Sequence, residues 1–221
     1  LLMVILLNSI GFAQHLVSVG GTSVNTTTTS VIPINSCYVY NYSQQIVLAS
    51  EFAQGNGANG VINKIRYYYP SSNTISTTNW NSWTVYLGTT TQNTFASTSN
   101  WIPLTALTQV YSGTVTPIGG NWMEITLTTP FPYNAASNLV VAVREQVSGF
   151  NCTANWASYT ASGNQGIYYY SDSTNPNPAS PVAASGISSS VAQIRFDITP
   201  LVLIILFLIF RIIVFHLTKP I

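Results

Sequence analysis

The sequence predicts an all-β fold, a two-sheet antiparallel sandwich of the jelly-roll-like kind, with an apolar N-terminal signal and a C-terminal hydrophobic helix. Eight or nine short segments with strand character follow one another between turn signals, and the body shows no convincing helical segment. Apolar and polar residues alternate along several of them, as in strands with one buried face. Hydrophobic residues make up 47% of the 221-residue chain and aromatic residues 12%, enough apolar surface for one core.

Four segments are expected along the chain: a signal peptide at residues 1–13, a polar leader at residues 14–30, the sandwich at residues 31–199 and a hydrophobic tail at residues 200–221. The first is an apolar run of signal length, with small residues at Gly11 and Ala13 where a signal peptidase cuts. A buried N-terminal strand is the alternative. The leader is rich in Gly and Thr and predicts little packing.

A β-hairpin is predicted at residues 109–128, where two strand-like runs flank the turn residues 117–120. In its second run, Met123, Ile125 and Leu127 share one face, which we assign to the core. The opposite face meets solvent or a ligand, and it carries Trp122, Glu124, Thr126 and Thr128.

Further strands are expected at residues 38–42 and 46–52, 60–69, 82–89, 138–146, 167–171 and 191–198. Residues 138–146 are nearly continuously apolar through Val143, which indicates a strand covered on both faces and therefore the most central one. The long polar crossing at residues 90–106 carries Phe95, Trp101 and Ile102, and a connection of this length is usually structured or functional.

The tail is different in kind, since its apolar run begins at Leu201, ends at Leu217 and is interrupted by Arg211 and His216. Leu, Ile, Phe and Val each favour insertion by about 0.3–0.6 kcal/mol, and one central Arg costs about 2.5–3.5 kcal/mol, so the sum favours a membrane anchor. Arg211 and Lys219 near its C-terminal end would leave the body outside the cytoplasm. A truncation or frameshift product without a selected function is the alternative.

Charged residues are only 5% of the chain, and Ser, Thr, Asn and Gln supply the polarity instead, which indicates an extracellular or cell-surface location. Without the tail, the body carries four cations and five carboxylates, a formal charge of −1. A nucleic-acid binder needs a basic patch to neutralise phosphates, and this body has too few cations to form one. We therefore expect no nucleic-acid partner.

The two histidines, His15 and His216, both lie outside the expected sandwich. Their positions exclude Ser-His-Asp and Cys-His catalysis and a His-based zinc site in the body. Glu124 and Glu145 are the only carboxylates placed to form a glycosidase-like pair, but ion pairs with Lys64, Arg66 or Arg144 explain them better. Calcium-loop spacing is absent too, so we expect no enzyme, no metal and no cofactor.

Cys37 and Cys152 are the only cysteines. An even number in a secreted chain predicts one disulfide between them, with two free thiols as the alternative.

Aromatic side chains are the remaining resource for binding. The loop residues Trp80, Trp101 and Trp156 are expected to be exposed, and each Tyr triplet, at residues 67–69 and 168–170, must point one face outward. Exposed rings offer stacking surfaces to sugars or proteins. The candidate ligand-binding residues are therefore Trp80, Trp101, Trp156, Tyr68 and Tyr169, although Tyr is also a favoured strand residue.

The runs SQQIVLASEF, GVINKIRYYY, SWTVYLGTT, TQVYSGTV, NWMEITLTTPFPY, NLVVAVRE and AQIRFDI together resemble β-sandwich modules of large secreted surface proteins of Bacteroidetes bacteria, which are adhesin-like or appended to secreted proteases. The resemblance covers residues 34–198 and implies a jelly-roll-like domain, secretion, and a role in adhesion or substrate targeting. It carries over no catalytic residue.

The expected function is therefore that of a non-catalytic, secreted or cell-surface module that binds a glycan or a protein. The alternative is an accessory, substrate-targeting domain of a secreted hydrolase of which this chain is a piece.

Overall fold

The computed structural model describes residues 14–27, 29–71, 80–147 and 156–201. A short α-helix, α1 (Ala49–Gln54), and a 3-10 helix, η2 (Leu104–Ala106), accompany the strands. The strands are β1 (His15–Val19), β2 (Thr29–Ser30), β3 (Tyr40–Val47), β4 (Gly60–Tyr69), β5 (Trp83–Thr90), β6 (Leu107–Gly113), β7 (Asn121–Tyr133), β8 (Asn138–Glu145), β9 (Trp156–Thr160), β10 (Gly166–Ser171), β11 (Gly186–Ser188), β12 (Ser190–Ala192) and β13 (Ile194–Pro200).

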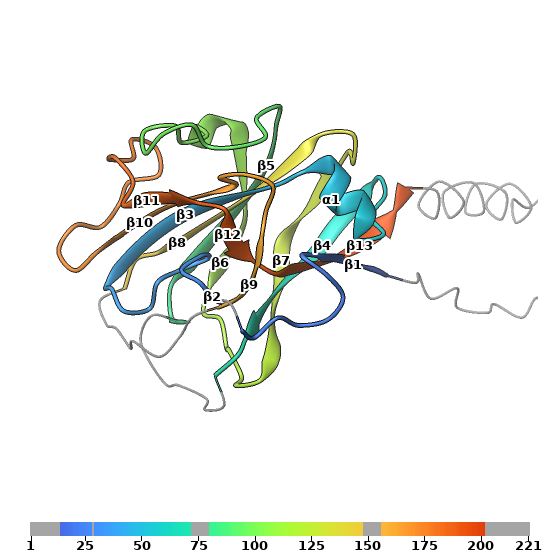
Figure 1. The fold of residues 1–221 in the computed structure, drawn as a ribbon, viewed down its shortest axis with the longest axis horizontal. Helices are drawn as coiled ribbons and strands as arrows, with labels where there is room; N and C mark the ends of the chain where they lie inside the picture. The colour runs from blue at the N-terminus through green and yellow to red at the C-terminus, as the bar shows by residue number, and fades with distance from the viewer. Residues whose placement is uncertain (1–13, 28, 72–79, 148–155, 202–221) are drawn as a thin grey trace, which may run out of the picture.

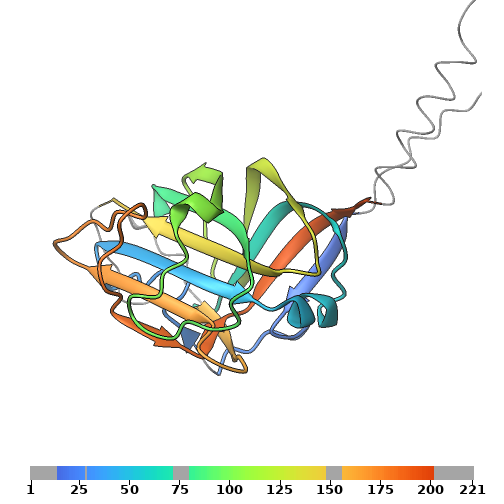
Figure 2. The same cartoon turned by 90° about the horizontal axis from the view of Figure 1, so that it is seen from above.

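Two antiparallel sheets form the layers of the fold, as Figures 1 and 2 show. One sheet has four strands in the order β1-β13-β4-β7, and the other has six in the order β11-β10-β3-β8-β5-β6. A small sheet, β12-β9-β2, lies beside them. The inward side chains of the two large sheets form one main hydrophobic core. The predicted all-β sandwich with antiparallel sheets is thus confirmed.

The predicted hairpin at residues 109–128 is wrong in its pairing, although both strands exist. Strand β6 pairs with β5, whereas β7 pairs with β4 in the other sheet. The turn residues therefore carry the chain from one layer to the other. Residues of β6 and β7 still approach each other, and the Thr128 hydroxyl donates to the Val110 carbonyl over 3.0 Å. The period-two pattern identifies the faces of a strand but not its partner.

The predicted core positions are confirmed. Met123, Ile125 and Leu127 are buried on the inner face of β7. Strand β8 lies between β3 and β5 and is buried along most of its length, as expected for the most central strand.

The first described residues do not form a polar leader. His15–Val19 is strand β1, which pairs with β13 from His15↔Ile198 to Val19↔Ile194 and buries Val17 and Val19 in the main core. Thr29 and Ser30 form β2 against β9. Two apolar residues at alternate positions are too short a signal to reveal an edge strand, so the sequence placed the domain start too late. As a result, the first and last strands lie side by side (Figures 1 and 2).

The extended segment expected at residues 46–52 is also partly wrong, because β3 ends at Val47 and α1 begins at Ala49. The Glu51 carboxylate accepts the Leu48 N–H over 2.9 Å and satisfies a donor at the helix start. Phe52 anchors the helix to the core, with its ring 4.8 Å from that of Tyr133.

The crossing between β5 and β6 is structured, as its length indicated. It covers the outer face of the six-stranded sheet and forms a second hydrophobic cluster there, with Phe95 and Ile102 buried against Ile46, Val140 and Ile167. The buried Gln44 side chain binds this segment with both ends of its amide, donating to the Ile102 carbonyl and accepting the Ile102 N–H, each over 2.8 Å.

Several predictions concern residues outside the described part of the chain. The signal peptide at residues 1–13 and the tail beyond Leu201 both lie there, and so does Cys152, so its disulfide with Cys37 stays a prediction. Among the described residues, no helix has the length and apolar character needed to span a membrane.

Candidate functional site

Two of the three tryptophans expected to be exposed are buried. Trp156 is 0% exposed and Trp80 is 4% exposed. They pack with Trp83, Tyr67 and Tyr69, at centroid distances of 5.6 to 6.2 Å. The expectation of loop exposure came from the polar neighbours of these residues, but Trp156 begins β9, whose first side chain points into the core. Neither ring offers a face to a ligand.

Trp101 and Tyr169 both lie on the outer face of the six-stranded sheet, next to Tyr42. The half-buried ring of Trp101 stacks on Tyr42 at 4.9 Å, and its indole N–H donates to the Val182 carbonyl over 2.9 Å. Tyr169 pairs in register with Tyr42. Trp101 therefore covers a buried tyrosine and contributes to packing at this position.

Tyr68 lies on the outer face of the four-stranded sheet. Its neighbours in β4, Tyr67 and Tyr69, point into the core, so the triplet alternates as predicted. Tyr68 stands opposite Trp122 of β7, with the rings 5.5 Å apart in an edge-to-face arrangement. Its hydroxyl donates to the Gly120 carbonyl over 2.8 Å, at the turn where β7 begins. This turn uses the left-handed conformation of Gly120, with φ of 68°.

Trp122 also contacts Arg195 of β13, whose guanidinium carbon lies 4.0 Å from the centroid of the indole ring. Because β4 lies between β7 and β13, Trp122 reaches across a strand to make this contact. The Arg195 guanidinium also donates to the Thr22 carbonyl over 2.8 Å. Burial, and then the charge of Arg66, lower the pKa of Arg195, but an arginine remains a cation throughout the accessible pH range.

An ion network continues along the same face. Glu124 accepts from Lys64 over 2.6 Å and from Arg66 over 2.7 Å, and Arg66 also binds Asp197, with one of its two contacts at 2.8 Å. Burial lowers the pKa of Arg66, but its hydrogen bonds to Asp197 and Glu124 outweigh this effect and raise the pKa overall. The hydrogen bond from Lys64, with that from Arg66, holds the pKa of Glu124 below its ordinary value against a weaker opposing effect of burial.

We refer to this surface as the charged aromatic face, formed by Lys64, Arg66, Tyr68, Trp122, Glu124, Arg195 and Asp197. It holds five of the nine charged residues that the sequence has between residues 14 and 200. The predicted ion pairs of Glu124 with Lys64 and Arg66 are confirmed. The face offers aromatic rings for stacking, together with side chains that donate and accept hydrogen bonds.

Of the predicted ligand-binding residues, only Tyr68 belongs to this face. Trp122 and Arg195 were missed as site residues, although the alternation in β7 placed Trp122 on the outward face. No sequence signal pairs Arg195 with it, because their proximity depends on the sheet order β13-β4-β7.

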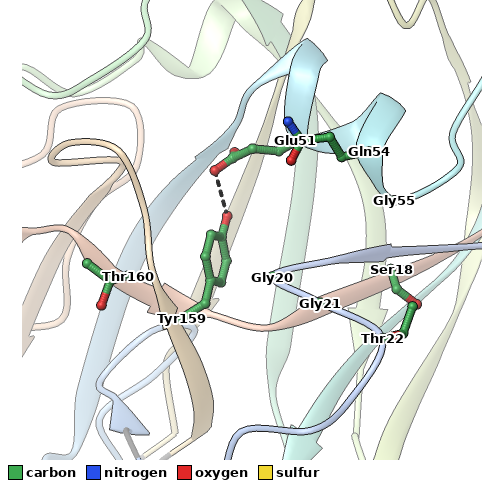
Figure 3. Close-up of a pocket in the computed structure, with 9 residues that line it drawn as sticks. All are labelled: Ser18, Gly20, Gly21, Thr22, Glu51, Gln54, Gly55, Tyr159 and Thr160. Atoms are coloured by element: carbon green, nitrogen blue, oxygen red, sulfur yellow. Dashed lines mark hydrogen bonds between the residues drawn. The ribbon is translucent and has the colours of Figure 1, made fainter.

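A pocket of about 390 Å³ lies between the end of β1, helix α1 and strand β9 (Figure 3). Its lining includes the side chains of Ser18, Thr22, Glu51, Gln54, Tyr159 and Thr160, along with three glycines. The Tyr159 hydroxyl points at the Glu51 carboxylate over 3.3 Å, as Figure 3 shows. Burial, and then the charge of Glu51, raise the pKa of Tyr159, which keeps this phenol neutral.

Glu145, the other carboxylate singled out in the sequence, is buried in β8 and accepts from Asn41 over 3.2 Å and from the Val147 N–H over 2.9 Å. It belongs to the six-stranded sheet, whereas Glu124 belongs to the four-stranded sheet. Within the described ranges, no three side chains of His, Cys, Asp or Glu gather closely enough to hold a metal ion.

No family model, no curated protein and no solved structure matches this chain. The resemblance to bacterial surface modules therefore stays a prediction.

Proposed function

We propose that this protein is a non-catalytic β-sandwich module that binds a glycan through the charged aromatic face. The observation that carries the proposal is the concentration of charge beside two half-buried aromatic rings on an outer sheet face. In a chain with only 5% charged residues, five charged side chains share one sheet face with Tyr68 and Trp122. The pair of Lys64 with the exposed Glu124 contributes little to stability, about 0–1 kcal/mol, so stability alone does not require this pair.

The chemistry of the face suits a sugar. A half-buried indole presents an apolar surface on which a sugar ring can stack, and the adjacent guanidinium and carboxylate groups can bind hydroxyls. A protein partner would favour a continuous apolar patch. The exposed large hydrophobic residues in the described part of the chain come from separate segments, at Leu16, Ile118, Val182 and Leu201. We therefore favour a glycan over a protein.

A jelly-roll-like topology and a secreted or surface location belong to the same proposal. The strand order supports the topology, since β1, β4, β7 and β13 form one sheet while β3, β5, β6 and β8 are adjacent in the other. Most consecutive strands in this set alternate between the sheets. The low charge content and the abundance of Ser, Thr, Asn and Gln support a location outside the cell.

The experiment is a glycan array probed with the purified full chain, followed by calorimetric titration of the best glycan. The variants are Trp122→Ala and Tyr68→Ala, and Tyr169→Ala on the other sheet is the matched aromatic control. Loss of one stacking ring should weaken binding by about tenfold, and Tyr169→Ala should bind like the wild type. Absence of any bound glycan, or equal affinity in all variants, would remove the proposal.

A further inference from the structure

The pocket between β1, α1 and β9 holds a carboxylate whose partners are all neutral. Glu51 is the single charged residue of its lining. It accepts the Leu48 N–H over 2.9 Å, the Gln165 amide over 2.8 Å and the Tyr159 hydroxyl over 3.3 Å. Among the described residues, no Lys, Arg or His lies within ion-pair distance of it. Glu124 and Asp197, by contrast, are both paired with cations.

The two oxygens of Glu51 are used unequally. Oε2 accepts the two shorter hydrogen bonds, whereas Oε1 has only the long contact with Tyr159. A carboxylate has about four acceptor positions, so Oε1 retains capacity for a stronger donor. Half-buried negative charge without a counter-ion favours a cation in the adjacent space.

The rest of the lining suits a small cation with several N–H donors. Tyr159 supplies an aromatic ring, and Ser18, Thr22 and Thr160 supply hydroxyl oxygens. Gly20 is needed beside the ring, because a Cβ atom there would lie 2.3 Å from Tyr159 Cδ1, and its φ of 84° disfavours any side chain. A volume of about 390 Å³ accommodates a small ligand or the end of a long side chain.

We propose that this pocket binds a primary ammonium group, with Glu51 as its counter-ion. The N–H donors of such a group match the free acceptor position of Glu51 and the hydroxyl oxygens elsewhere in the pocket lining. A lysine side chain of a protein and a free amino sugar both carry this group, so the experiment distinguishes the two. This pocket borders the charged aromatic face, because the Arg195 guanidinium donates to the carbonyl of Thr22 in the pocket lining over 2.8 Å.

The test is an NMR titration of the full chain with two amines. One is lysine amide acetylated on its α-nitrogen, which keeps the side-chain ammonium group, and the other is glucosamine. Their uncharged counterparts, N-acetylated norleucine amide and N-acetylglucosamine, are the ligand controls. The amines, but not their uncharged counterparts, should shift the backbone signals of Gly20, Glu51 and Tyr159. The amine that binds more tightly identifies the source of the ammonium group.

Glu51→Gln keeps an acceptor oxygen but removes the charge, and it should weaken amine binding by about tenfold or more. Asp172→Asn, which removes an exposed carboxylate elsewhere, should have no effect. If Glu51→Gln proves unfolded, Gln54→Lys introduces a competing cation at an exposed lining position and should abolish binding in a folded chain. Equal shifts with the uncharged ligands, no shifts with either amine, or unchanged binding in the folded variants would each overturn the proposal.

Discussion

Arg195 of β13 lies over the ring of Trp122 of β7, at 4.0 Å from its centroid, although a full strand separates the two residues. The ring of Tyr68 also packs against this indole in an edge-to-face arrangement, with the centroids 5.5 Å apart. These contacts hold Trp122 in one orientation, which would lower the entropic cost of the proposed glycan binding.

Trp156 and Trp122 should respond very differently to truncation. Trp156→Ala removes a fully buried ring and its hydrogen bond to the Ile34 carbonyl, so it should reduce the free energy of unfolding by about 3–5 kcal/mol. Trp122→Ala loses the contacts of a half-buried ring with Arg195 and Tyr68 and should cost only about 1–2 kcal/mol. Urea unfolding of the two variants measures both values. A loss of unfolding free energy for Trp122→Ala as large as that for Trp156→Ala would show that Trp122 belongs to the core.

The contribution of Glu124 to the free energy of unfolding should depend on pH. Its pKa is lowered in the folded state, so its contribution is present above the ordinary glutamate pKa of about 4.3 and is lost as pH falls through the folded value. Because its side chain is 38% exposed, Glu124→Gln should cost at most about 1 kcal/mol at neutral pH. The difference between the two free energies of unfolding should shrink as pH falls below about 4.3 and vanish below the folded pKa of Glu124. A difference that grows with acidification would contradict the ion network.

Gln44 should be essential for holding the crossing that contains Ile102. Gln44→Leu removes two hydrogen bonds of 2.8 Å and leaves the Ile102 N–H and carbonyl without their partner, so it should cost about 2–4 kcal/mol. Gln109→Leu, at an exposed position of β6, is the control and should change stability by less than about 0.5 kcal/mol. Hydrogen exchange at Ile102 should accelerate in the first variant only. Unchanged exchange there would mean that the cluster of Phe95 and Ile102 holds the crossing by itself.

The buried tyrosines should ionise only at a pH well above that of a free tyrosine. Burial raises the pKa of Tyr42 and of Tyr133 to about 12. Because the unfolded pKa is about 10, the stability associated with the neutral phenols is present below pH 10 and is lost as pH rises through the folded values. Ultraviolet absorbance should therefore show tyrosinate formation that continues well above pH 10 and ends with unfolding. A single transition near pH 10 in a folded chain would contradict the burial of these rings.

The sequence predicted the strands where period-two alternation is long, as in β4, β5 and β7, because each has a face of adjacent core residues. The sequence did not predict which strands pair, and it did not reveal the short strands. The strands β6 and β7 are neighbours in the chain but belong to different sheets, and β1 offers only two core positions. For the same reason Tyr68 could be found from a triplet, whereas the contact of Trp122 with Arg195 depends on sheet order. The burial of Trp80 and Trp156 was hidden by their polar neighbours.

The proposed glycan-binding role of the charged aromatic face is tested most directly by the indole N–H signals of the five tryptophans, followed by NMR during titration with the best glycan. We expect the Trp122 signal to shift, while those of Trp80, Trp83 and Trp156 in the core and of Trp101 on the other sheet stay in place. A shift of the Trp101 signal with Trp122 unchanged would move the site to the six-stranded sheet and contradict the account.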